Sequence, residues 1–285
     1  MAESQVVEAQ RAPDVSPVLP VTEAEVLDIS SRIRALQAED PFIEKGTVKV
    51  FLAEPSQGQV DIICEDNRKD FYMELGLVRQ CSRFRFFSGS TGRMLISFAR
   101  DMFADEAVKL GMDWLLMFDD DMVLPRKMFL AMMRNAEDAD IVVPLAFQRV
   151  PPYKPVIYDI HRWEEDGKLM IKTEHKLDYP INKTFPIDAA GAGVMLIRTS
   201  FLQKIPKPWF FSNTSLGEDI YFCVRAKQAG ARIVCDSRIK VGHLGYPNLI
   251  TEWDFIKANK EALKEIRKGE LELVDAGIPA LTTGL

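Results

Sequence analysis

Between residues 47 and 147 the chain alternates strand-like runs with amphipathic segments, and this alternation restricts the possible folds more than any other feature. The strand-like runs lie at 48–53, 83–88, 114–118 and 141–147, and the helix-like segments between them lie at 60–78, 94–111 and 125–137. The order β-α-β-α-β-α-β is typical of a largely parallel sheet whose faces are covered by helices. We therefore predict an α/β fold.

The rest of the chain extends this pattern less regularly. Residues 148–185 are rich in Pro, Tyr, Trp and charge, and we expect strands and loops over the sheet edge. Further strands are predicted at 193–198 and 231–236, with helices at 216–230 and 251–271.

The predicted domain organisation has three parts. Residues 1–45 carry three early prolines and then a helical pattern at 21–38, which predicts a disordered lead followed by a peripheral helix. Residues 46–248 form the main domain, and 249–285 form a C-terminal helix and tail.

Net charge, the length of apolar runs and cysteine spacing argue against several classes of protein. The formal net charge of −6 gives no electrostatic reason to expect general nucleic-acid binding. The N-terminus lacks the pattern of a signal peptide, and no apolar run approaches the roughly 20 residues that span a bilayer. None of the four cysteines lies in a CxxC pair, so we expect reduced thiols in a cytoplasmic protein.

Three consecutive aspartates, Asp119, Asp120 and Asp121, follow the apolar run in the stretch WLLMFDDDMVLP. Ligands of open α/β sheets bind beyond the carboxyl ends of the strands, where these side chains lie. In extended backbone Asp119 and Asp121 would point to one side and repel each other. A divalent cation such as Mg²⁺ or Mn²⁺ would relieve this repulsion. The alternative is a solvated turn before the next helix.

The stretch WLLMFDDDMVLP resembles the DxD segment of GT-A-fold glycosyltransferases, closest to the family 2-like group. Four further segments resemble that family in the same order along the chain. They are SFARDMFADEAVKLGMDW, FPIDAAGAGVMLIRTSFLQKIPKPWF, GEDIYFCVRAKQAG and VGHLG. The resemblance covers roughly residues 47–246 and implies a GT-A fold, a mixed, mostly parallel sheet flanked by helices. One departure is Arg100-Asp101, where the family has an Arg-Asn pair.

The resemblance also implies roles for the metal-site residues. Asp121 would bind the metal directly, and Asp119 would hold the ribose of the donor or share the metal. His243 would be a further metal ligand, since an imidazole suits Mn²⁺ better than Mg²⁺. The metal would bridge the two phosphates of the donor and neutralise charge on the leaving group. The alternative for His243 is an ordinary loop histidine.

The remaining candidate residues would act on the donor and the acceptor. By resemblance, Asp219 is the general base of an inverting displacement and Glu218 positions the acceptor; acids at a helix N-terminus also stabilise the helix without any catalytic role. Arg100 would contact the nucleotide, with an ordinary surface charge as the alternative. Gly191 and Gly193 would let the sugar approach the backbone closely.

These observations predict a metal-dependent glycosyltransferase that moves a sugar from a nucleoside diphosphate sugar to an acceptor hydroxyl. A nucleotidyltransferase of related fold is an alternative, but the loop EPSQGQVD after the first strand has no Lys or Arg to hold a triphosphate. A non-catalytic sugar-nucleotide-binding module and a metal-dependent hydrolase are further alternatives. The sequence does not specify the sugar, the base or the acceptor.

Overall fold

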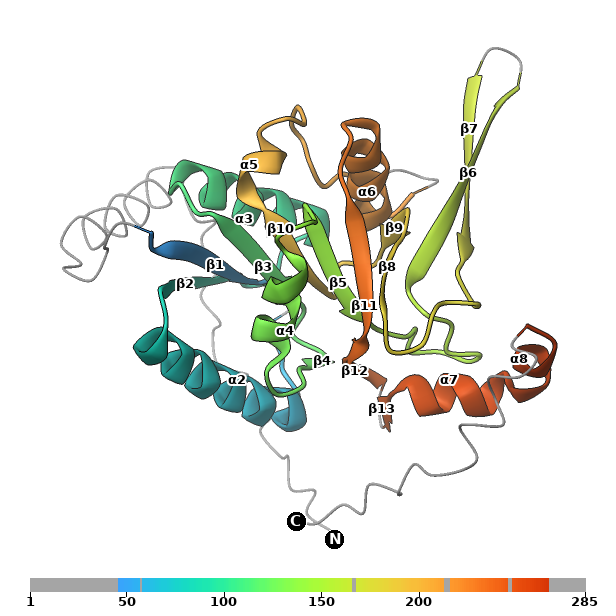
Figure 1. The fold of residues 1–285 in the computed structure, drawn as a ribbon, viewed down its shortest axis with the longest axis horizontal. Helices are drawn as coiled ribbons and strands as arrows, with labels where there is room; N and C mark the ends of the chain where they lie inside the picture. Colours follow the sequence, from blue (N-terminus) through green and yellow to red (C-terminus); the bar gives the residue numbers. More distant parts are fainter. Residues whose placement is uncertain (1–45, 57, 166–167, 213–215, 246–247, 267–285) are drawn as a thin grey trace, which may run out of the picture. The chain divides into compact units, whose positions relative to one another are not determined.

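A seven-stranded sheet forms the centre of the protein (Figure 1). The computed structural model describes residues 46–56, 58–165, 168–212, 216–245 and 248–266, all within one compact unit, Ile43–Leu285. The strand order is β2-β1-β3-β10-β5-β11-β8. The strands are β1 (Val48–Glu54), β2 (Phe84–Ser90), β3 (Trp114–Phe118), β5 (Ile141–Leu145), β8 (Thr184–Pro186), β10 (Val194–Arg198) and β11 (Ile233–Lys240).

Most strands of this sheet run in one direction. β1 is parallel to both β2 and β3, and β11 is parallel to β5. β10 is antiparallel to both of its neighbours, and β8 is antiparallel to β11. The carboxyl ends of β1, β2, β3, β5 and β11 therefore lie along one edge, and the predicted mixed, mostly parallel sheet is confirmed.

Helices cover both faces of the sheet (Figure 1). The helices α2 (Ile62–Cys81) and α4 (Met128–Asn135) cover one face, and α3 (Ile96–Lys109), α5 (Thr199–Leu202) and α6 (Glu218–Gln228) cover the other. Aromatic pairs join each layer to the sheet: the ring centroids of Phe71 and Phe118 are 5.6 Å apart, and those of Phe51 and Phe103 are 6.0 Å apart. Alternate strand residues supply these two faces, as the two-residue period of a strand requires.

Two smaller sheets extend the carboxyl edge. One joins β13 (Asn248–Ile250), β12 (Gly242–Gly245) and β4 (Met122–Val123), and the other joins β7 (Lys168–His175), β6 (Ile157–Glu165) and β9 (Ala189–Ala190). In Figure 1 the β6–β7 hairpin projects away from the main sheet. The strands and loops expected at 148–185 are therefore present.

Two predicted helices differ from the observed ones. The helix expected from Pro125 begins at Met128, because Lys127 has a left-handed backbone, with φ 61°, that cannot belong to the helix. The helix expected at 251–271 is divided at Asn259 into α7 (Glu252–Ala258) and α8 (Lys260–Ile266). The Asn259 side chain donates to the carbonyl oxygens of Pro152 and Phe255, at 2.6 and 2.9 Å. The predicted helix at 21–38 and the tail beyond 266 lie outside the described residues.

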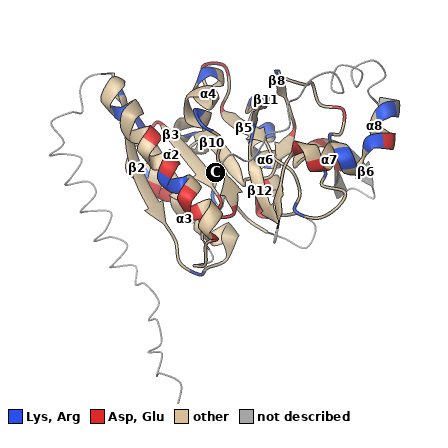
Figure 2. Ribbon diagram, turned by 90° about the horizontal axis from the view of Figure 1, so that it is seen from below, with Lys and Arg blue, Asp and Glu red and all other residues tan. Residues whose placement is uncertain are grey.

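Acidic and basic side chains share the helix surfaces. Figure 2 shows both signs side by side on α2 and on α7. Among the described residues, no helix is both long and apolar enough to cross a lipid bilayer.

Candidate functional site

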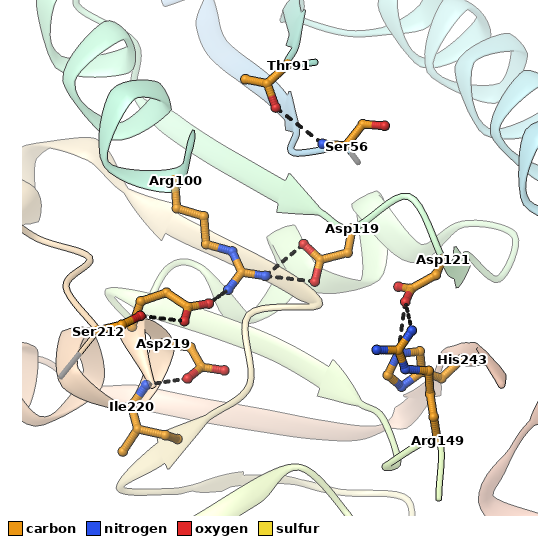
Figure 3. A network of polar contacts seen from close by, with 11 residues as sticks. Ser56, Thr91, Arg100, Asp119, Asp121, Arg149, Ser212, Asp219, Ile220 and His243 are labelled. Carbon is orange, nitrogen blue, oxygen red and sulfur yellow. Dashed lines mark hydrogen bonds and ion pairs between the residues drawn. The ribbon is translucent and has the colours of Figure 1, made fainter. Parts of the chain in front are cut away.

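The three aspartates lie at the carboxyl end of β3, where the backbone turns. The amide of Met122 donates to the carbonyl of Asp119 at 3.2 Å, so the chain is not extended through the three residues. Figure 3 shows Asp119 facing Arg100 while Asp121 faces His243. The side chain of Asp120 accepts a 2.7 Å hydrogen bond from the hydroxyl of Ser56. The turn thus directs Asp119 and Asp121 to different partners, whereas an extended backbone would have placed these two carboxylates on the same side.

A buried arginine joins the end of β3 to the start of α6. Nη2 of Arg100 donates to both carboxylate oxygens of Asp119, each at 2.7 Å, and Nη1 donates to the carboxylate of Glu218. Arg100 is only 3% exposed. Burial lowers the pKa of Arg100, but the charges of Asp119 and Glu218 raise it, and the net shift is upward. The two carboxylates are therefore held by a permanent positive charge.

Burial and the neighbouring charges shift the pKa of Asp119 in opposite directions. Burial raises the pKa of its carboxyl, the charge and hydrogen bonds of Arg100 lower it, and Asp121 raises it again, so the net shift is upward. Both oxygens of Asp119 accept hydrogen bonds from Arg100, so the protein already supplies a cationic partner for this carboxylate.

The candidate base lies in the first turn of α6. One oxygen of Asp219 accepts from the amide of Ile220 at 2.7 Å, and the hydroxyl of Ser212 donates to Glu218 at 3.3 Å (Figure 3). Burial raises the pKa of Asp219, Arg100 lowers it and Glu218 raises it, so the net shift is upward. An acid with a raised pKa is a stronger base once ionised, which suits proton abstraction.

The two candidate glycines lie on either side of this region. A Cβ atom built on Gly191 would lie 3.6 Å from Oδ2 of Asp219, so the glycine keeps space open beside the carboxylate. The carbonyl of Gly193 accepts from the amide of Asp119 at 2.8 Å, and a Cβ there would lie 3.3 Å from the sulfur of Met122. Gly193 therefore packs against the aspartate turn. Contact of either glycine with a sugar remains a prediction.

Asp121 and His243 are brought together by the small sheet. Met122 pairs with His243 between β4 and β12, and the amide of Leu244 donates to the carbonyl of Asp121 at 2.9 Å. Nε2 of His243 then lies 3.4 Å from Oδ2 of Asp121, and Nη1 of Arg149 lies 2.9 Å from the same oxygen. Burial raises the pKa of Asp121, but His243 and Arg149 lower it more, so the carboxyl is held ionised.

The orientation of the His243 ring fits a metal ligand. Its Nδ1 lies 2.7 Å from the carbonyl oxygen of Phe147, which can only accept, so Nδ1 carries the proton. In the neutral ring, the lone pair of Nε2 then faces the carboxylate of Asp121, and two acceptors in this position require a cation or a second proton between them. Metal-binding histidines commonly donate their other N–H to a carbonyl in this way.

The donor set agrees with the predicted metal in part. A carboxylate oxygen and an imidazole nitrogen are suitable ligands for Mn²⁺. The third predicted ligand, Asp119, faces Arg100 instead, and within the described ranges no group of three His, Cys, Asp or Glu side chains is close enough to hold a metal. Asp121 and His243 are therefore the two side chains that would hold a cation, at a carboxylate oxygen that Arg149 also contacts.

A cavity of about 280 Å³ opens at the carboxyl ends of β1 and β2. Residues from both loops and from α2 line it, including Glu54, Ser56, Arg68, Lys69, Tyr72 and Thr91. Its floor is polar, because Arg68 bonds to the carboxylates of Glu54 and Glu65. The bond from Ser56 to Asp120 links the cavity to the aspartate turn. No motif in the sequence indicated Ser56, Arg68 or Arg149.

No protein-family model matches the sequence, and no curated protein matches it either. Among solved structures, A197 from STIV is 20% identical over 72% of this chain and 94% of its own, with a TM-score of 0.45. GalNAc-T7 with UDP, GalNAc and Mn²⁺ is 12% identical over 76% of this chain and 48% of its own, with a TM-score of 0.41. A UDP-glucose pyrophosphorylase complexed with UDP-glucose is 10% identical over 77% of this chain and 100% of its own, also with a TM-score of 0.41. Because these TM-scores lie below 0.5, none of the likenesses carries an argument. The sheet and its flanking helices give the chain a mixed, mostly parallel α/β fold, and its likeness to GT-A enzymes remains the resemblance seen in the sequence.

Proposed function

We propose that the chain is a metal-dependent glycosyltransferase that moves a sugar from a nucleoside diphosphate sugar to an acceptor hydroxyl. The observation that carries this proposal is the bridge through Arg100. It holds Asp119, from the strand that ends in the aspartates, and Glu218, from the helix that carries the candidate base, in one place. This contact between residues far apart in the sequence supports a single site that uses both elements.

The cation site comprises Asp121 and His243, whose facing acceptor atoms suit Mn²⁺ or Mg²⁺. A cation there would supply Lewis-acid stabilisation of the departing diphosphate. Arg149, which pairs with Asp121, would bind a phosphate oxygen of the donor beside such a cation. Asp119, fixed by Arg100, is assigned to the ribose of the donor.

Asp219 acts as the general base in this proposal. It takes the proton of the acceptor hydroxyl as the acceptor oxygen bonds to the anomeric carbon. The bond from that carbon to the diphosphate breaks in the same step, with inversion, and the nucleoside diphosphate leaves. Glu218 positions the acceptor, and the open space at Gly191 admits it beside Asp219.

The cavity between the first two loops is assigned to the nucleoside. Its place beyond the carboxyl ends of two parallel strands is where α/β sheets bind ligands. Tyr72 supplies an aromatic ring, and the hydrogen bond from Ser56 to Asp120, which joins the cavity to the aspartate turn, supports this assignment. A cytoplasmic location remains a prediction from the sequence.

A nucleotidyltransferase is the second candidate, and one observation favours it. The loop after β1 has no Lys or Arg, but Arg68 and Lys69 of α2 line the cavity beside that loop. Arg68 is already paired with Glu54 and Glu65, so Lys69, whose ion pairs are exposed, is the cation that the helix offers to a triphosphate. This candidate predicts pyrophosphate release when the protein is given a nucleoside triphosphate and a sugar 1-phosphate.

Calorimetry with UDP, GDP, CDP and dTDP, with and without Mn²⁺, tests the proposal. We expect micromolar binding of one diphosphate that requires Mn²⁺ and is lost in Asp121→Ala. Glu261→Ala removes an exposed carboxylate of α8 and serves as the control that keeps binding. Binding of none of the four, or equal binding by Asp121→Ala, contradicts the proposal. Pyrophosphate release in the parallel assay would favour the second candidate.

A further inference from the structure

One side chain of α2 clamps the backbone that follows the three aspartates. Nδ2 of Asn67 donates to the carbonyl of Leu124 at 3.0 Å, and the amide of Leu124 donates to Oδ1 of Asn67 at 2.6 Å. The amide group thus satisfies both backbone groups of one residue, as a neighbouring strand would do. The side chain of Leu124 is buried in the core, so these two hydrogen bonds connect α2 to a residue that is itself held by packing.

The other attachments of this turn come from other elements. The amide of Asp119 is held by Gly193, and the carbonyl of Asp121 is held by Leu244 of β12. Asn67 is the attachment from α2, the helix that contacts β4 in Figure 1. Backbone groups on both sides of Asp120 and Asp121 are therefore hydrogen bonded to other elements of the fold.

The distance between these two side chains matters because of the geometry of a bound cation. Nε2 of His243 and Oδ2 of Asp121 are 3.4 Å apart, so one ion could contact both atoms. A shift of the aspartate turn would move Asp121 away from that ion. Mg²⁺ requires its ligand atoms about 2.0–2.1 Å away. Metal sites tolerate deviations of about 0.2 Å from such values.

We propose that Asn67 is a positioning residue for the cation site: its two hydrogen bonds to Leu124 hold the turn so that Asp121 and His243 can bind one divalent cation together. This inference rests on the proposed function, because it needs a cation at that pair. Asn67 itself does not touch the cation. The inference extends the site to α2, which carries none of the residues that the family resemblance indicated.

A matched control comes from a second asparagine. The side chain of Asn135 donates to Asp236 at 2.8 Å and accepts from Thr184 at 2.7 Å. It lies at the end of α4, outside the candidate site. Asn135→Ala therefore removes an amide with both of its atoms hydrogen bonded and serves as a measure of simple structural loss.

The experiment measures Mn²⁺ affinity of the full chain by calorimetry, in the presence of the diphosphate that the wild type binds, together with the melting temperature without metal. We expect Asn67→Ala to weaken Mn²⁺ binding about tenfold, the lower end of what residues that orient metal ligands contribute. Asn135→Ala should keep Mn²⁺ affinity within about twofold of the wild type, as expected for a residue outside the metal's ligand shells. The melting temperature should fall in both variants.

A second variant guards against loss of the fold. Asn67→Asp keeps the acceptor for the amide of Leu124 and loses only the donor. Its added negative charge would by itself strengthen cation binding, so weaker Mn²⁺ binding in this variant reports lost positioning. Wild-type affinity in both Asn67 variants, or equal weakening by Asn135→Ala, overturns the inference alone. A wild type that binds no Mn²⁺ with any diphosphate overturns the proposed function and this inference with it.

Discussion

Replacing Arg100 by methionine measures how strongly one guanidinium holds the candidate site together. The side chain of Arg100 is 4% exposed, and those of its partners Asp119 and Glu218 are 24% and 13% exposed. Removing one partner of a buried ion pair costs about 3–5 kcal/mol, because the remaining charge is left without compensation. Since both carboxylates keep some contact with water, we expect about 3 kcal/mol, the lower end of that range.

Urea denaturation of a small set of variants checks this value. Adding Asp119→Asn and Glu218→Gln to Arg100→Met removes the uncompensated charges, so we expect it to recover about half of the loss or more. Lys264→Met breaks an exposed pair with Glu261 and is the control, expected to cost less than about 0.5 kcal/mol.

The dependence on pH gives the sharper test. Burial raises the pKa of Asp119, and Arg100 opposes that rise. Without Arg100, the pKa in the folded state moves further above its unfolded value, so folding takes up a proton. Stability from such a group is present at low pH and is lost as pH rises through the folded pKa. The deficit of Arg100→Met should therefore shrink between about pH 7 and pH 5. A cost below about 1 kcal/mol at pH 7, or a deficit that grows as pH falls, would refute this reasoning.

Three further predictions follow from single contacts. Asp101→Ala removes the acceptor for two backbone amides and should cost about 1–3 kcal/mol in urea denaturation, whereas Asp101→Asn should retain most of the stability; equal losses would count against this account. Gly191→Ala places a methyl group in ordinary contact with Asp219, so the melting temperature should change by less than about 4 °C while turnover falls about tenfold, and unchanged turnover would contradict the assignment. Burial raises the pKa of Asp236, but hydrogen bonds from Arg238 and Asn135 lower it more, so this carboxylate contributes stability above about pH 4 that is lost as pH falls through the lower folded pKa. Asp236→Asn should then cost less at about pH 2.5 than at pH 7 in urea denaturation, and a larger cost at low pH would be the opposite of the expected sign.

Local patterns predicted most strands of the main sheet and its mostly parallel character, but not which strands run antiparallel. The apolar run at 114–118 is β3, and the run at 193–198 becomes β10 with its first residue left out. Nothing in the residues of β10 shows that it lies antiparallel between β3 and β5, because strand direction depends on the path of the connecting chain. The two-residue strand β4 is too short for any periodicity, although its pairing of Met122 with His243 brings the preceding Asp121 next to the histidine.

The directions of the three aspartates were beyond the reach of a period-two pattern. That pattern assumes extended backbone, whereas the chain turns from Asp119 onward. The side chain of Asp119 instead points towards Arg100, and that of Asp121 points towards His243 and Arg149. These partners come from distant parts of the chain. In contrast, Glu218 and Asp219 do begin a helix, because acids in a first turn obey a local rule that the sequence displays.

The replacement of the family's asparagine by Asp101 has a physical explanation in the contacts of α3. Successive helix residues point about 100° apart, so Arg100 faces the site while Asp101 faces the neighbouring segment. One oxygen of Asp101 accepts from the amides of Trp209 and Phe210, at 2.6 and 3.1 Å. An asparagine oxygen can accept the same two bonds, and the carboxylate strengthens them with its charge. That segment continues to Ser212, which donates to Glu218, so two adjacent residues of one helix hold Glu218 from opposite ends: Arg100 directly and Asp101 through the segment it anchors.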